Sequence, residues 1–159
     1  MLNDVEDGKF APQASLTRAT MLTILYNYEK PEGAYGESGF ADVAAEKWYG
    51  DSVAWAAENG LVSGYNENFR LDDAITRQEA AVILFRFAKY MDKGPVEDWA
   101  IRIDYVDVAE ISDWAYEAIM WATMKGITSG RPDKTLDPTG IATRAEVATM
   151  LTKFIENVQ

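Results

Sequence analysis

The chain has 159 residues, of which 48% are hydrophobic and 12% aromatic, so most of it can fold around a core. It carries 26 acidic against 15 basic residues, a net charge of -11 with no basic cluster, which argues against a nucleic-acid partner. Neither cysteine nor histidine occurs, which excludes disulfides, thiolate or histidine metal sites, and the nucleophile-histidine pairs of many hydrolases.

The first predicted helix begins at the phrase Thr17-Arg18 and continues with apolar residues at helical spacing. Thr17 is placed as an N-cap, whose side chain accepts a hydrogen bond from an early backbone N–H of the helix. Arg18 follows in the first turn, where a cation faces the positive end of the helix dipole and forfeits about 0.3–1 kcal/mol relative to an acid. Thr76-Arg77 and Thr143-Arg144 open two later helices in the same way.

Three arginines in this unfavourable place need an explanation. One explanation is a bound anion, because free N–H groups at a helix start and an adjacent guanidinium together suit a carboxylate or a phosphate. The other is that each arginine pairs with a structural aspartate from a neighbouring repeat. Both explanations can hold, each for different copies of the motif.

The second copy of the pattern follows a connector over residues 31–39 that is rich in proline, glycine and acids. Asp42 precedes a helix predicted over residues 48–59, and Gly60 stands where a left-handed C-cap favours glycine. We interpret Asp42 as serving helix entry and turn formation, with the orientation of a neighbouring arginine as the alternative. The second motif helix then begins at Thr76.

The third copy repeats this order after a second connector at residues 92–98. Asp107 takes the place of Asp42, and a helix predicted over residues 114–125 ends before Gly126. The two copies align without a gap from the tryptophan that opens this helix to the glycine of the loop behind it. The repeat period is roughly 60–67 residues.

The three motif helices share their capping and their apolar stripes. Glu79 and Glu146 complete capping boxes in the second and third copies, whereas Thr20 stands at that position in the first. One face of each helix is expected to be core. The residues on these faces are Met21, Ile24, Leu25 and Tyr28; Ala80, Ile83, Leu84, Phe87, Ala88 and Met91; and Val147, Met150, Leu151, Phe154, Ile155 and Val158.

The first copy is incomplete, since its entry aspartate and its tryptophan helix have no counterpart in the chain. A half repeat exposes an apolar face, so we expect a fragment of a longer polypeptide or a missing helix supplied by another chain. The predicted repeats are 1–31, 38–92 and 103–159, within one globular unit.

The phrases at residues 40–43, 53–65 and 75–79 resemble S-layer homology repeats, and the resemblance covers nearly the whole chain. It implies an all-α fold in which tandem helix-loop-helix repeats form a pseudo-threefold arrangement around a central helical bundle. It also implies a non-catalytic anchor on the bacterial cell surface. Such an anchor binds secondary cell wall polysaccharide, often pyruvylated, in grooves between the repeats.

The resemblance also implies a set of ligand-binding residues in this sequence. They are the motif arginines Arg18, Arg77 and Arg144, the loop residues Ser63, Gly64, Ser129 and Gly130, and the tryptophans Trp48 and Trp114. Tyr65 and Arg131 occupy equivalent places after the Ser-Gly pair, and their difference predicts that the two grooves do not bind identically. Arg77 and Arg144 are favoured over Arg18, because the first copy is truncated.

Plainer roles compete with binding at several of these positions. For Trp48 and Trp114 we favour core packing over sugar stacking, because buried tryptophan is the commoner case. The loop glycines serve either close approach of a ligand or a turn with positive φ. Gln78, where the family motif has alanine, is interpreted as a mild change at an exposed position.

Two other functions remain as alternatives. The grooves could receive a neighbouring protein subunit, as in S-layer assembly. Acidic side chains could also support glycoside hydrolysis, although no unique pair of opposed carboxylates stands out. Residues 3–8 resemble a calcium loop only faintly, because Val5 occupies a ligand position; no metal and no cofactor is predicted. No apolar run suits a membrane span, and no signal peptide begins the chain.

Overall fold

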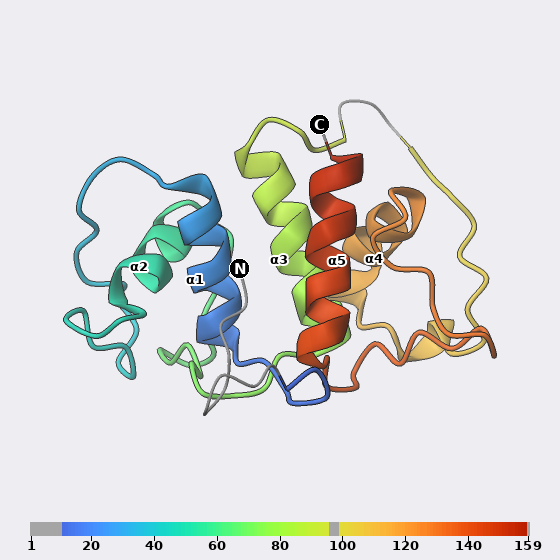
Figure 1. Cartoon of the computed structure of the whole chain (residues 1–159), viewed down its shortest axis with the longest axis horizontal. Coiled ribbons are helices and arrows are strands. Elements are labelled where there is room, and N and C mark those ends of the chain that lie inside the picture. Colours follow the sequence, from blue (N-terminus) through green and yellow to red (C-terminus); the bar gives the residue numbers. More distant parts are fainter. Residues whose placement is uncertain (1–10, 96–98, 159) are drawn as a thin grey trace. The chain divides into compact units, whose positions relative to one another are not determined.

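The computed structural model describes residues 11–95 and 99–158, and in these residues the fold is all-α, as predicted (Figure 1). The described residues form five α-helices, one short 3-10 helix and isolated one-residue β-bridges. The chain divides into two compact units, one built on Ser15–Ile75 and the other on Thr76–Gln159 together with Pro12–Ala14. The repeat boundaries and their pseudo-threefold arrangement within one globular unit stay predictions.

Unit 1 contains α1 (Arg18–Glu29) and α2 (Gly50–Glu58), which pack against each other. The indole of Trp55 is fully buried between them and meets the ring of Tyr26 edge to face, with 5.7 Å between ring centroids. A hydroxyl pair at 2.9 Å joins Thr23 of α1 to Ser52 of α2. The contact therefore combines apolar burial with one satisfied polar pair.

Unit 2 contains α3 (Arg77–Tyr90), the 3-10 helix η1 (Val108–Glu110), α4 (Asp113–Met124) and α5 (Arg144–Asn157). Its core is aromatic at the centre. Phe87 of α3 stacks on Phe154 of α5 at 5.6 Å between centroids, and Trp121 of α4 lies against both Phe85 and Phe154. In Figure 1, α3 and α5 run side by side. The contacts between helices place α4 against α3.

The predicted caps are confirmed, although α2 begins at Gly50, two residues after its predicted start. Thr76 and Thr143 both form complete capping boxes with the glutamate three residues later. Thr17 Oγ1 accepts from the Thr20 backbone N–H at 3.2 Å and forms a hydroxyl pair with Thr20 at 2.7 Å, without a glutamate to complete the box. Gly60 and Gly126 follow α2 and α4 with φ of 71° and 67°, the left-handed conformation that glycine adopts without strain.

The apolar stripes of the motif helices are buried with few exceptions. Tyr28 is wrong as a core residue, because its side chain is exposed at the end of α1. Met91 and Ile155, also near helix ends, are only half-buried. Val158, the last residue of the third stripe, is buried, so only some of the positions near the helix ends lose their packing.

The interpretation of Trp48 and Trp114 as core residues is wrong. They are 64% and 54% exposed, and both lie at or just before the first turn of their helix. The buried indoles are Trp55 and Trp121, each seven residues further on and each 0% exposed. In α4 the seven residues from Trp114 to Trp121 are two helical turns, so both tryptophans share one face and only the second reaches α3, whereas Trp48 precedes the N-cap of α2 and lies outside that helix.

The interpretation of Gln78 as an exposed residue is also wrong. Gln78 is buried in α3, where its side-chain amide donates to the hydroxyl of Ser112 at 3.0 Å and its amide oxygen accepts from the Ser112 backbone N–H at 3.0 Å. Ser112 is the N-cap residue of α4. Gln78 thus satisfies a backbone donor at the start of α4 and ties that helix to α3.

In the described part of the chain, none of the helices combines the length and apolar character needed to cross a lipid bilayer.

Candidate functional site

The starts of the three motif helices do not offer free backbone donors to an anion, contrary to one explanation of the arginines. The N–H of Arg18 donates to the Asp73 carbonyl at 3.0 Å and that of Arg77 to the Gly140 carbonyl at 3.0 Å. The N–H of Arg144 donates to the Ala14 carbonyl at 2.8 Å. In each case a loop carbonyl of another repeat supplies the negative partner that the helix dipole favours.

Arg77 confirms the other explanation, in which the motif arginine pairs with internal acids. Its Nε and Nη2 donate to the Glu146 carboxylate at 2.8–3.1 Å, and its Nη1 donates to Asp137 Oδ2 at 2.9 Å. The Arg77 side chain is only 15% exposed. All three of its nitrogens are therefore engaged, and the two carboxylates offset the dipole penalty of its position.

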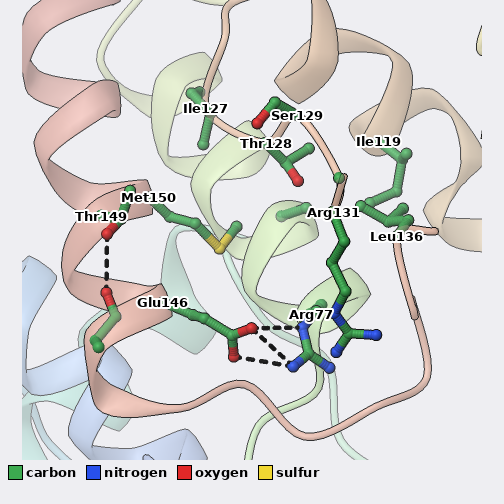
Figure 2. A pocket seen from close by; sticks show the side chains of 13 residues that line it. Arg77, Ile119, Ile127, Thr128, Ser129, Arg131, Leu136, Glu146, Thr149 and Met150 are labelled. Atoms are coloured by element: carbon green, nitrogen blue, oxygen red, sulfur yellow. Dashed lines mark hydrogen bonds and ion pairs between the residues drawn. The ribbon is translucent and has the colours of Figure 1, made fainter. Parts of the chain in front are cut away.

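A pocket of about 280 Å³ nevertheless opens beside Arg77, entirely within unit 2 (Figure 2). It brings together four residues that the sequence predicted to bind ligand, namely Arg77, Ser129, Gly130 and Arg131. Its other lining residues are Ala81, Ile119, Ile127, Thr128, Leu136, Ala145, Glu146, Thr149 and Met150. The pocket thus combines aliphatic side chains, hydroxyl groups and a cationic end. None of its lining residues is aromatic.

Arg131 is the more accessible guanidinium of this pocket. Its side chain is 46% exposed, and its Nη2 donates to Asp137 Oδ2 at 3.0 Å. Figure 2 shows the guanidinium groups of Arg131 and Arg77 lying close together, with Glu146 approaching Arg77 from α5. Because Asp137 Oδ2 accepts from both arginines, a single carboxylate holds the two cations next to each other.

Asp137, Glu146 and the aliphatic residues of the pocket are parts of the site that the sequence reasoning missed. The sequence does single out Asp137. Aligning the loops before Thr76 and Thr143 places Asp137 opposite Arg70, so the charge at this position reverses between the repeats. Glu146 was recognised only as half of a capping box, a role it does perform: its carboxylate accepts from the Thr143 N–H at 2.8 Å. The Glu146 carboxylate also accepts from Arg77, which lies 69 residues away in the sequence.

The entry aspartates hold the loops that carry the site. Asp42 accepts from the backbone N–H groups of Phe69 and Arg70, both at 2.7 Å, and Asp107 accepts from those of Leu136 and Asp137. Burial by itself would raise the pKa of each aspartate, but these hydrogen bonds outweigh it and hold the pKa below its usual value. Each aspartate therefore fixes the loop that faces a motif arginine.

The loop glycines make room for an internal ring. A Cβ added at Gly130 would lie 2.8 Å from Tyr105 Cε1, and one added at Gly64 would overlap the ring of Phe40. Gly130 also has a φ of 72°, whereas Gly64 is not among the residues with positive φ. The turn with positive φ is therefore confirmed at Gly130, and at both glycines the group that approaches the backbone is an internal aromatic ring; close approach of a ligand stays a prediction.

In unit 1 the equivalent residues form a different arrangement. Arg18 is buried, its Nε donates to the Phe69 carbonyl at 3.2 Å, and its guanidinium carbon lies 4.7 Å from the Phe69 ring centroid. Tyr65 covers the same guanidinium at 5.1 Å, which is within cation-π distance. Ser63 is exposed in the preceding loop. An aromatic ring thus stands where unit 2 has the guanidinium of Arg131.

The remaining predicted ligand residues do not line the pocket. Arg144 is buried in unit 2, and Trp48 and Trp114 are exposed at the starts of their helices. Neither tryptophan belongs to the lining of this pocket, so a sugar in it would contact aliphatic side chains instead of stacking on an indole. The calcium-like residues 3–8 lie outside the described residues.

Glu146 links the pocket to acid stability. Burial would raise its pKa, but the Thr143 N–H and the Arg77 guanidinium outweigh this effect and hold the pKa below the usual glutamate value. A carboxyl group with a lowered pKa stabilises the folded state in full only above its unfolded pKa. That contribution is lost as the pH falls through the folded value.

We expect the free energy of unfolding to stay level from neutral pH down to about pH 5 and to fall as the pH drops below about 4.5. Urea titrations at stepped pH would measure it. Glu146→Gln should lower stability at neutral pH and flatten the acid dependence, because its carboxylate no longer titrates. Glu117→Gln, at an exposed acid of α4, is the control. An unchanged slope in Glu146→Gln would contradict the assignment.

Comparison with known proteins identifies the repeats. The family described as S-layer homology domain matches residues 39–81 and 104–148, which are the second and third copies. An exoglucanase, XynX, of Acetivibrio thermocellus is 32% identical over 98% of this chain, and a surface-layer 125 kDa protein of Lysinibacillus sphaericus is 32% identical over 96%. A cellulosome-anchoring protein of Acetivibrio thermocellus is 38% identical over 57%.

The chain spans only a small part of each of these relatives, namely 14% of the exoglucanase, 13% of the surface-layer protein and 20% of the cellulosome-anchoring protein. What the exoglucanase and the surface-layer protein have in common with this chain is therefore a module of about its own length. The family match extends over more than half of the chain and includes Arg77, Arg131 and Glu146 of the pocket. The chain belongs to the S-layer homology domain family.

Proposed function

We propose that this chain is a non-catalytic anchor that binds secondary cell wall polysaccharide in the unit 2 pocket. Family membership places the chain at the bacterial cell surface, and relatives whose names denote anchoring or the surface layer support an attachment role. The observation that best supports the proposal is that Arg77 of one motif lines the same pocket as the loop residues 129–131 and Glu146 of the next repeat.

The lining of the pocket suits a substituted sugar. Ile119, Ile127 and Met150 offer aliphatic surface to a ring face or a methyl group, while Thr128 and Ser129 carry hydroxyls for hydrogen bonding. Arg131 lies at the cationic end, where a ligand carboxylate could take a charge-assisted hydrogen bond. A pyruvate ketal has both a methyl group and a carboxylate, and fits this division of the pocket.

A binding titration with pyruvylated and depyruvylated wall polymer tests the proposal. We expect removal of the ketal to weaken binding at least about tenfold, or about 1.4 kcal/mol, because a charge-assisted contact to Arg131 is lost. Isothermal titration calorimetry on the full chain would measure both affinities.

Pull-down on purified cell wall sacculi provides the control. Binding should disappear when the non-peptidoglycan polymer is chemically removed from the sacculi. Retained binding would point to a protein or peptidoglycan partner and would contradict the polysaccharide proposal. Release of reducing ends from the polymer would contradict the non-catalytic role.

A further inference from the structure

One loop position has the same backbone geometry in both units, but its side chains carry opposite charges. Arg70 in unit 1 and Asp137 in unit 2 both adopt the left-handed conformation, with φ of 63° and 53°. Each donates its backbone N–H to the entry aspartate of its own repeat at 2.7 Å, Arg70 to Asp42 and Asp137 to Asp107. The two side chains therefore start from equivalent points beside the residues predicted to bind ligand.

In unit 2 this position neutralises the pocket. Asp137 Oδ2 accepts from Arg77 at 2.9 Å and from Arg131 at 3.0 Å, while Glu146 accepts from Arg77. Two guanidinium groups and two carboxylates have a summed charge of zero. The oxygen of Asp137 also occupies the point between the two arginines where a ligand carboxylate would be held best.

In unit 1 the same position adds a cation. The Arg70 guanidinium lies 5.0 Å from the Tyr65 ring centroid, and Arg18 lies 5.1 Å from the same centroid. Arg70 pairs with Asp73 three residues later, and its side chain is 55% exposed. An acid partner that is itself 44% exposed compensates a charge only weakly in water.

We infer that the residue at this loop position sets the charge beside the pocket in unit 2, where Asp137 limits the preference for acidic sugars. The inference rests on the proposed function, since it concerns the same pocket. A built-in carboxylate competes with the ligand carboxylate for both arginines, and so reduces the gain that an acidic substituent brings. Discrimination by an unfavourable internal element is a general way to tune specificity.

Asp137→Asn tests the inference, because asparagine keeps the shape and tolerates the left-handed backbone while removing the charge. The probes are a methyl glycoside with a pyruvate ketal and the same glycoside without it, titrated by calorimetry into the full chain. We expect the affinity for the acidic glycoside to rise about fivefold or more and that for the neutral glycoside to stay within about twofold. Asp104→Asn, which removes an exposed acid paired with Lys134 at 3.2 Å, is the matched control and should change neither.

Two further variants keep the result interpretable. When Arg131→Ala is already present, adding Asp137→Asn should not raise the affinity for the acidic glycoside, which would locate the effect at the unit 2 pocket. Arg70→Asn, in unit 1 and outside the lining of the pocket, is a second control and should leave both affinities within about twofold of wild type. An acid preference that Asp137→Asn leaves unchanged or lowers would overturn the inference while leaving the proposed function intact. A wild-type chain that binds neither glycoside nor wall polymer would overturn the proposed function itself.

Discussion

Trp121→Ala should destabilise the protein by about 3–5 kcal/mol, the usual cost of removing a large buried aromatic side chain. Trp121 is 0% exposed and lies 5.4 Å from Phe85 and 6.3 Å from Phe154, measured between ring centroids. These three rings join α3, α4 and α5, so the cavity would open at the centre of unit 2. Thermal unfolding followed by circular dichroism would measure the loss, expected at about 10 °C for a chain of this size.

Trp114→Ala is the matched control, since it makes the same change in the same helix. Its side chain is 54% exposed, and the expected cost is within about 0.5 kcal/mol. If the two variants lost equal stability, the placement of the buried indole would be wrong. Trp121→Phe adds a finer comparison, because the Trp121 Nε1 has no hydrogen-bond partner among the described residues, and phenylalanine keeps most of the apolar contact.

Sequence reasoning predicted the helix caps of this fold but not which of these tryptophans is buried. Helix starts and ends depend on local chemistry, such as the capping box at Thr76 or the left-handed glycine at Gly126, and these were predicted correctly. Which of two tryptophans on one helix face becomes buried depends on where the neighbouring helix crosses. That crossing is a tertiary property, and no local pattern reports it.

The candidate site likewise contains residues that the sequence predicted and residues that it did not. Arg77, Ser129 and Gly130 were predicted from the resemblance to S-layer homology repeats and Arg131 from its place after the Ser-Gly pair, and the structure brings all four to one pocket. The partners of Arg77 could not be predicted from spacing, because Asp137 and Glu146 lie in another repeat, 60 and 69 residues away. Gln78 was misplaced for the same reason, since its partner Ser112 belongs to α4.

Arg77→Ala should lower the free energy of unfolding by about 2–4 kcal/mol, because it removes the central cation of the site. Arg77 connects α3 to Glu146 of α5 and to Asp137 of the pocket loop, and it is largely buried. Removing it would leave two carboxylates facing each other across the space that the guanidinium filled. Both are partly exposed, so water can solvate them, which keeps the expected cost below that of a fully buried pair.

Arg131→Ala provides the control for this experiment, because it removes the other arginine that donates to Asp137 Oδ2. Its side chain is 46% exposed, so we expect a stability change of less than about 1 kcal/mol together with weaker binding of the pyruvylated polymer. Urea unfolding and calorimetric titration of both variants would separate the two roles. A variant Arg77→Ala that unfolds like the wild type but no longer binds would show that Arg77 contacts the ligand directly. Loss of stability in Arg77→Ala, with loss of acid recognition in Arg131→Ala, would assign the structural role to the buried arginine and the binding role to the exposed one.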